Sequence, residues 1–250
     1  MSGEKPNTEE EVMRKLYLAV PLSIAIVVLG AFVHAGLRYL KNFDKTVNVK
    51  GLAERVVKSD LAIWQVNFKM NSDEVKNQYL EYKRIKGKVK ALIEKGGFSS
   101  DDLDFDNINI TDNRDSMYVN KNGVKHKLMP RYTGYAKFTL TTNRVDQLRQ
   151  LSGQVDELVL AGVSISRSDV YYKFESLNEI KAEMIKEATL NARDAAKSFA
   201  ANANNNVRGI RRADQGYFEI RDSGTIENWS DNRALFKKVR VVTNLSFFLD

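Results

Sequence analysis

The chain begins with one long apolar segment and then changes to alternating apolar and polar positions. Residues 16–37 contain no Asp, Glu, Lys or Arg. As a helix rising about 1.5 Å per residue, this segment would be about 33 Å long, which is enough to cross a bilayer. The pattern predicts a transmembrane signal anchor, preceded by a tail (1–15) and followed by a short linker (38–45). Its lipid-facing side chains would include Leu16, Leu22, Ile26, Leu29, Phe32 and Leu37.

Two other interpretations of this segment remain open. A cleaved signal peptide would use the small residues around Ala35, but its apolar core normally has only about 7–15 residues and its leader is not acidic. A buried core helix is the third interpretation. We favour the uncleaved anchor. Basic residues flank the segment on both sides, so charge alone does not fix its orientation.

Strand patterns dominate the rest of the chain. Between Leu61 and Met70 every second residue is apolar, which predicts a strand with one buried face. The same alternation occurs over 132–140 and 239–247, and Gly51 suggests a bulge or bend in the strand before Leu61. The residues expected to face the core are Ala62, Trp64, Val66, Phe68, Met70, Tyr132, Gly134, Ala136, Phe138, Leu140, Val239, Val241, Leu245 and Phe247.

Three segments have helical spacing. The first runs from Val75 to about Ile93, with Ser72 as its expected N-cap and two glycines after it. The second covers about 145–160. The third and longest opens at a capping-box pair, Ser176 and Glu179, and reaches about Asn202. Helices interleaved with half-buried strands indicate an α+β fold, with mainly antiparallel sheets covered by helices.

The longest helix carries an inward stripe of small side chains, which would let it lie close to a sheet or to another helix. Tight packing within one subunit and a subunit interface are both open for this stripe. Its members are Ala188, Ala192, Ala195, Ala196, Phe199 and Ala200.

Asn122 and Gly123 separate two short β-like runs, which is the signature of a two-residue hairpin. The hairpin carries His126, which we expect to be an exposed residue without a catalytic role. The only other histidine is His34, and the chain contains no cysteine. Disulfides, cysteine nucleophiles and multi-histidine metal sites are therefore excluded, and we expect no cofactor and no bound metal.

The net charge of +7 is compatible with solubility, anionic lipid or nucleic acid. We expect no nucleic-acid partner, because no binding motif accompanies the charge. Exposed basic side chains near the end of the chain would face lipid head groups if the body lies against a bilayer, although ordinary solvated faces have the same pattern. They are Arg211, Arg212, Lys237, Lys238 and Arg240.

Four segments together resemble the SIMPL domain family, in its bacterial periplasmic or inner-membrane-anchored branch. They are "VNVKGLAERVVKSDLAIW", "GYAKFTLTT", "IKAEMIKEATLNARDAAKSFA" and "KKVRVVTNLSFFL". The resemblance covers 46–249. It implies a cytoplasmic tail, a periplasmic body at 46–250, closed homo-oligomers and a link to envelope integrity and stress tolerance. It supplies no active-site residues, and "NANNNVRG" stands where the family often has glycine after the helix.

We therefore expect a non-catalytic protein of the bacterial inner membrane, single-pass, whose periplasmic body assembles into a ring or cage. Its expected partners are copies of itself, the lipid bilayer and an unidentified envelope protein. The alternative is a metal-dependent envelope hydrolase that uses the acidic loop from Asp101 to Asp106, with Asp102 and Asp104 between them. That loop lacks the glycine and the terminal glutamate of an EF-hand, so a solvated loop is the simpler interpretation.

Overall fold

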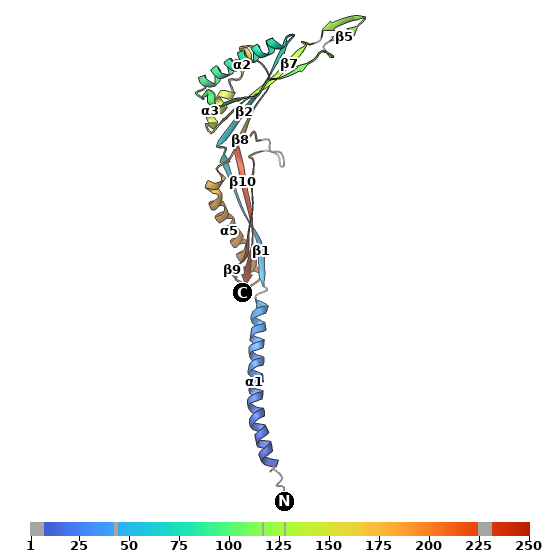
Figure 1. Ribbon diagram of the computed structural model, residues 1–250. Coiled ribbons are helices and arrows are strands. Elements are labelled where there is room, and N and C mark those ends of the chain that lie inside the picture. The colour runs from blue at the N-terminus through green and yellow to red at the C-terminus, as the bar shows by residue number, and fades with distance from the viewer. Residues whose placement is uncertain (1–7, 43–44, 117, 128, 225–231) are drawn as a thin grey trace. The chain divides into compact units, whose positions relative to one another are not determined.

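The computed structural model describes residues 8–42, 45–116, 118–127, 129–224 and 232–250 (Figure 1). The chain divides into two compact units. Unit 1 contains the residues up to Ala53 together with 185–216 and 242–250, and unit 2 contains 54–184 and 217–241. Helices and antiparallel strands alternate along both, which confirms the α+β fold.

Unit 2 is built on a five-stranded sheet. Its order is β3-β7-β2-β8, with β4 also paired to β7. The central strand β2 pairs antiparallel with β7 and β8, so that Trp64 lies opposite Leu140 on one side and Val170 on the other. The strands are β2 (Leu61–Ser72), β3 (Leu103–Phe105), β4 (Asn109–Asp112), β7 (Tyr132–Thr142) and β8 (Ser164–Lys173).

Helices cover one face of this sheet, and the core of unit 2 lies between the two layers (Figure 1). The helices are α2 (Val75–Lys95), the short 3-10 helix η1 (Ser100–Asp102), α3 (Val145–Ser152) and α4 (Asp156–Leu160). The alternation expected along β2 is confirmed, since its five core residues are between 0% and 3% exposed. Trp64 and Phe138 meet edge to face with ring centroids 5.3 Å apart. Each such side chain contributes about 1.5–3 kcal/mol by burial.

Several boundaries in unit 2 differ from the sequence-based expectations. The helix expected over 145–160 is two helices, because α3 ends at its C-cap Gly153. The expected cap Ser72 is the last residue of β2, and its hydroxyl accepts from the Glu74 N–H at 3.1 Å. The N-cap of α2 is Glu74. The prediction that Ser72 caps α2 was therefore wrong, because β2 continues two residues beyond Met70, where the expected strand ended.

A three-stranded sheet, in the order β1-β10-β9, contributes residues to both units. Its strands are β1 (Thr46–Lys58), β9 (Val207–Asp222) and β10 (Phe236–Leu249). The parity expected for β10 is confirmed, because Val239, Val241, Leu245 and Phe247 are between 0% and 4% exposed. The helix α5 (Leu177–Asn202) also has residues in both units, and its C-terminal part belongs to unit 1.

Gly51 lets α5 approach β1 within unit 1. A Cβ atom added at Gly51 would lie 1.8 Å from the carbonyl oxygen of Ala188 and 2.8 Å from the Cβ of Ala192. Val49, Gly51 and Ala53 are all buried, so the alternation of β1 passes through Gly51 unchanged. A bulge would have shifted this parity. The prediction of a bulge at Gly51 was therefore wrong. A glycine is required there because the backbone of α5 leaves no room for a Cβ atom.

The small-residue stripe of α5 follows a strict spacing of four. Ala188, Ala192, Ala196 and Ala200 are between 0% and 2% exposed, whereas Phe199 is 62% exposed. Four residues advance about 40° more than one full turn, so the stripe winds around the helix as it crosses the twisted sheet. By the last turn the buried direction has moved away from Phe199. Its expected inward position was wrong for that reason.

Candidate functional site

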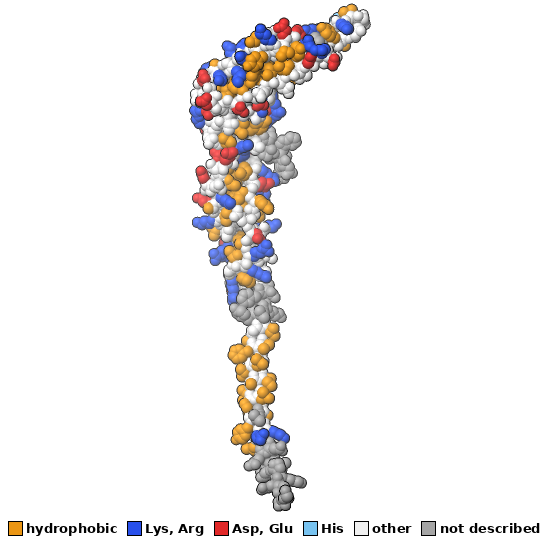
Figure 2. Space-filling view, viewed as in Figure 1, with side chains coloured by type: hydrophobic (Ala, Val, Ile, Leu, Met, Phe, Trp, Pro, Cys, Tyr) orange, Lys and Arg blue, Asp and Glu red, His pale blue; other side chains and the backbone are white. Residues whose placement is uncertain are grey.

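The N-terminal helix α1 (Thr8–Asn42) presents the largest apolar surface among the described residues. Its part from Met13 to Leu37 is long and apolar enough to cross a membrane, and none of it is buried. Figure 2 shows this part as a nearly continuous apolar surface with basic side chains at its N-terminal end. Of the expected lipid-facing residues, Leu22, Ile26, Leu29, Phe32 and Leu37 are 60–74% exposed, and the side chain of Leu16 lies outside the described part.

An apolar helix exposed along its length is not the core helix of a soluble body, since burial of such a surface is what stabilises a core. It fits a membrane anchor or a signal sequence. The helix begins inside the expected tail and extends to Asn42, inside the expected linker, while residues 1–7 and 43–44 lie outside the described part. The first strand of the body begins at Thr46, so the chain passes almost directly from α1 into β1.

A second apolar surface lies on the hairpin formed by β5 (Tyr118–Lys121) and β6 (Val124–Lys127). Asn122 and Gly123 have φ angles of 54° and 77°, which confirms the expected primed turn. Among the described residues these two strands pair only with each other, and every residue of both is exposed. Tyr118, Val119 and Val124 are 51%, 42% and 57% exposed.

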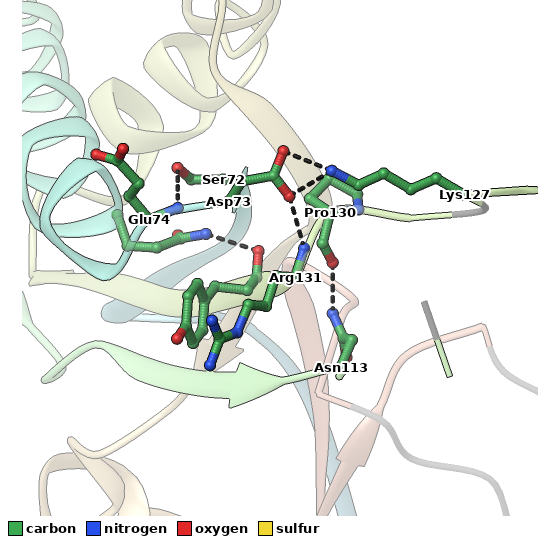
Figure 3. A network of polar contacts seen from close by, with 9 residues as sticks. Ser72, Asp73, Glu74, Asn113, Lys127, Pro130 and Arg131 are labelled. Atoms are coloured by element: carbon green, nitrogen blue, oxygen red, sulfur yellow. Dashed lines mark hydrogen bonds and ion pairs between the residues drawn. The ribbon is translucent and has the colours of Figure 1, made fainter. Parts of the chain in front are cut away.

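Polar contacts hold the base of the hairpin to the junction of β2 and α2 (Figure 3). Lys127 forms an ion pair with Asp73 at 2.6 Å, and the backbone N–H of Arg131 donates to the same carboxylate at 3.0 Å. The Lys127 ammonium and this N–H hold the pKa of Asp73 below its usual range. One surface carboxylate, Asp73, thus receives donors from the end of β6 and from the residue before β7, and these contacts tie the base of the hairpin to unit 2.

Two amide side chains complete this junction. Asn113 donates to the carbonyl of Pro130 at 3.1 Å and to the hydroxyl of Thr133 at 2.8 Å. Gln78, which is fully buried on α2, donates to the carbonyl of Tyr132 at 2.8 Å. These bonds fix the chain that leaves the hairpin where β7 begins. These contacts tie the base of the hairpin to unit 2, and among the described residues no second layer covers the hairpin itself.

The structure also contains a buried ion pair that the sequence analysis did not find. Lys237 was expected to be exposed, but it is buried and its ammonium donates to Asp222, with side chains 2% and 0% exposed. Lys237 has the parity of Val239 and Val241, so it must point to the buried side of β10. The alternation of buried and exposed positions along β10 was the signal in the sequence that could have revealed the burial of Lys237. The correction removes Lys237 from any surface site.

Asp222 receives further donors from the loop that precedes β10. Its carboxylate accepts from the backbone N–H groups of Arg233 at 3.1 Å and Ala234 at 3.4 Å. Burial alone would raise the pKa of Asp222, but the Lys237 ammonium and these N–H groups outweigh burial and lower it. The guanidinium of Arg233 in turn pairs with Asp169 at 2.9 Å, and Arg167 contacts the same carboxylate. Each charge in this group has a partner of opposite sign, which is typical of a structural ion-pair network.

The acidic loop does not form a site in the described structure. Asp101 and Asp102 are exposed in η1, and Asp104 is exposed on β3. Asp106 pairs with Lys137 at 3.3 Å, while Asp102 lies 4.0 Å from Arg144. Within the described ranges no group of three His, Asp or Glu side chains could hold a metal ion. These carboxylates therefore do not converge on one point.

His126 is exposed on β6, opposite Val119. Of the basic residues expected at the surface, Lys238 and Arg240 are half exposed and both lie near Glu54, at 3.7 Å and 3.6 Å. Arg212 pairs with Asp214 at 2.9 Å. The Arg211 guanidinium lies 6.0 Å from the ring centroid of Phe248. Only Arg211 and Arg212 of this set belong to unit 1.

A comparison with protein-family models matches residues 47–234 to SIMPL, described as a protein of unknown function (DUF541). The match covers about three quarters of the chain. This chain belongs to the SIMPL family. No curated protein matches the chain. The matched range begins after α1 and includes the hairpin, so the apolar helix is an addition in front of the SIMPL domain. The expected family is confirmed.

Proposed function

We propose that this SIMPL protein is a single-pass anchored protein of the bacterial inner membrane that assembles with copies of itself into a closed ring or cage. Its tail lies in the cytoplasm and its body in the periplasm, where the assembly supports envelope integrity under stress. Support for the anchor comes from an apolar helix, Met13–Leu37, that is not buried anywhere along its length.

The observation that carries self-assembly is the fully exposed hairpin β5–β6, which carries Val119 and Val124 on one face and Tyr118 on the other. An isolated two-stranded hairpin is only marginally stable in water, and exposed apolar clusters commonly mark protein interfaces. Tyr118 and Val124 lie near opposite ends of this hairpin, and both are more than half exposed. Packing on another body would bury them. The contacts of Lys127 and Arg131 with Asp73 support the base of the hairpin.

Anchoring in a bilayer favours contact between the hairpins and bodies of neighbouring copies. Chains held in one bilayer meet in two dimensions with a shared orientation, and closed symmetry ends the growth of repeated identical contacts. A second copy is the occupant favoured for the hairpin, because the anchor holds copies of the same chain side by side in the bilayer. Catalysis has no part in this proposal, since the candidate carboxylates do not converge.

Photocrosslinking at Tyr118 tests the proposal in native membranes. Full-length protein with benzoylphenylalanine at position 118 is irradiated, and the products are separated by mass. We expect adducts at multiples of the monomer mass that contain this chain alone. The same amino acid at the exposed Tyr79 of α2 is the matched control and should give no adduct ladder. Adducts from position 118 to a different protein, or none, would contradict self-assembly through the hairpin.

A further inference from the structure

The described part of unit 1 after α1 is strongly basic. Residues 45–53, 185–216 and 242–250 contain eight Lys or Arg and four Asp or Glu, a net charge of +4. They make up one fifth of the chain and hold more than half of its net charge of +7. A local excess of this kind is a signature of binding to an anionic surface.

Lys45, Lys197 and Arg208 lie toward one end of unit 1, together with Asp194 and Asp250. At this end Leu249 donates to the carbonyl of Lys45 at 3.0 Å, and Asp250 donates to the carbonyl of Asn206 at 3.1 Å. The start of β1, the end of β10 and the start of β9 therefore meet there. α5 ends at the same place, since Asn205 donates back to Ala200 at 2.8 Å. We name this region the strand-terminal end of unit 1.

Chain length places the strand-terminal end close to α1. The helix ends at Asn42, three residues before Lys45, and three residues span at most about 11 Å. An anchored α1 thus keeps this end near the membrane surface, whatever the direction of the body. Head groups extend about 5–7 Å beyond the hydrocarbon, and charges act over a further 8 Å or so at physiological salt.

Several basic side chains lie at or near this end of unit 1. Arg208 is the second residue of β9, and Arg211 lies about 13 Å from the start of the same strand. Lys197 is five residues before the end of α5, which is about 7.5 Å. Lys197 and Arg208 are exposed and pair at the surface with Asp194 and Asp250. Surface pairs of this kind are weak, so both cations can turn to a phosphate.

Exposed apolar side chains accompany these charges. Phe199, in the last turn of α5, is 62% exposed, and Ile210, on the first part of β9, is 50% exposed. Aromatic and apolar side chains beside Lys and Arg are typical of surfaces that lie at the membrane interface.

We infer that the strand-terminal end of unit 1 binds anionic lipid head groups through Lys45, Lys197, Arg208 and Arg211, with Phe199 and Ile210 at the lipid interface. This inference rests on the proposed anchoring of α1. Binding would hold the body against the bilayer and limit its rotation about the anchor, so that neighbouring bodies meet in one orientation.

The test uses full-length protein labelled at one position, which is straightforward because the chain has no cysteine. Ala201, exposed in the last turn of α5, is changed to Cys and carries an environment-sensitive fluorophore. The protein is reconstituted into vesicles of phosphatidylcholine alone or mixed with phosphatidylglycerol. We expect stronger, blue-shifted emission in the phosphatidylglycerol vesicles, and loss of that difference at high salt.

Charge reversal identifies the responsible residues. In the Ala201→Cys background, Lys197→Glu with Arg211→Glu should abolish the lipid-dependent difference, whereas Lys88→Glu with Lys90→Glu, an equal change on exposed α2, should retain it. Membrane attachment is checked separately by flotation of the vesicles. Equal emission from protein that floats with both vesicle types would overturn head-group binding and leave the anchor intact. Protein that floats with neither at high salt would overturn the anchor and this inference together.

Discussion

Lys237 on β10 and Asp222 on β9 form an ion pair that is closed to water, with side chains 2% and 0% exposed. The two strands are neighbours, and Ser223 donates to the carbonyl of Phe236 at 2.9 Å beside the pair. Removing one member of a buried pair leaves an uncompensated charge in a medium of low dielectric constant. The pair is therefore a point where a single substitution should strongly affect unit 2.

The Lys237→Met variant should lower the free energy of unfolding of unit 2 by about 3–5 kcal/mol, because Asp222 loses its cation and stays buried. Urea unfolding can be followed by the fluorescence of Trp64, which is fully buried in unit 2. A Trp229→Phe background leaves Trp64 as the only tryptophan. In the double variant Lys237→Met with Asp222→Asn, the free energy of unfolding should fall by much less than in Lys237→Met alone. A Lys237→Met variant as stable as the wild type would show that the pair does not matter.

The loop carboxylate of Asp60 gives a prediction about acid. It accepts from the backbone N–H groups of Glu175 and Ser176, both at 2.8 Å. Burial raises the pKa of Asp60, but these donors outweigh burial and lower it. The unfolded chain therefore binds the proton more readily, and the stabilisation, present above about pH 4, is lost as the pH falls below it.

The Asp60→Asn variant should consequently have a free energy of unfolding about 1–2 kcal/mol below that of the wild type at neutral pH. On acidification, its free energy of unfolding should fall by less than that of the wild type. Thermal midpoints measured from pH 7 down to pH 3 check both parts. Asp115→Asn makes the same charge change at an exposed position and should follow the wild type. Parallel acid curves for the Asp60 variant and the wild type would argue against this origin of the acid sensitivity.

Gly51 should not tolerate a side chain. Its added Cβ would lie 1.8 Å from a backbone oxygen of α5, so Gly51→Ala must push the helix away from β1. A cost of about 1–3 kcal/mol or more is typical of such overpacking. Hydrogen exchange of α5 amides within 185–200 should become faster. Gly209→Ala, in β9, meets nothing within 4 Å and is the control. Unchanged exchange in the Gly51 variant would contradict the close approach.

Asp73 should stabilise the hairpin without changing the stability of unit 2. Asp73→Asn weakens the contact with Lys127, so amides of β5 and β6 should exchange faster while those of β2 and α2 do not change. Glu74→Gln makes the same charge change one residue away and should have no effect on the hairpin. Slow hairpin exchange in the Asp73 variant would show that another contact fixes the hairpin.

Much of the fold could be predicted because single strands and helices follow local rules. The parity of Trp64 and Phe68 and the positive φ angles at Asn122 and Gly123 depend only on nearby sequence. Lys237 was misjudged because its charge was given more weight than its parity. Phe199 was misjudged because a stripe on a straight helix does not include the twist of the sheet beneath it.

The contacts that unite distant segments could not be predicted from one sequence. Nothing near Gly51 shows that α5 lies against it, since the two are separated by more than a hundred residues. Likewise, the pairing of Asp222 with Lys237 depends on the register of two long strands, which local propensity does not fix. The exposed state of the hairpin is also a tertiary property, because local sequence does not show whether another layer covers a pair of strands.

The mass of the full-length protein in a mild detergent tests self-assembly most directly. We expect one discrete species whose mass is an integral multiple of the monomer mass, measured by native mass spectrometry or light scattering. Tyr118→Ser with Val124→Ser should shift this species toward the monomer, because the exposed apolar surface of the hairpin is removed. A wild-type protein that is monomeric in detergent and in lipid nanodiscs would contradict the proposed assembly.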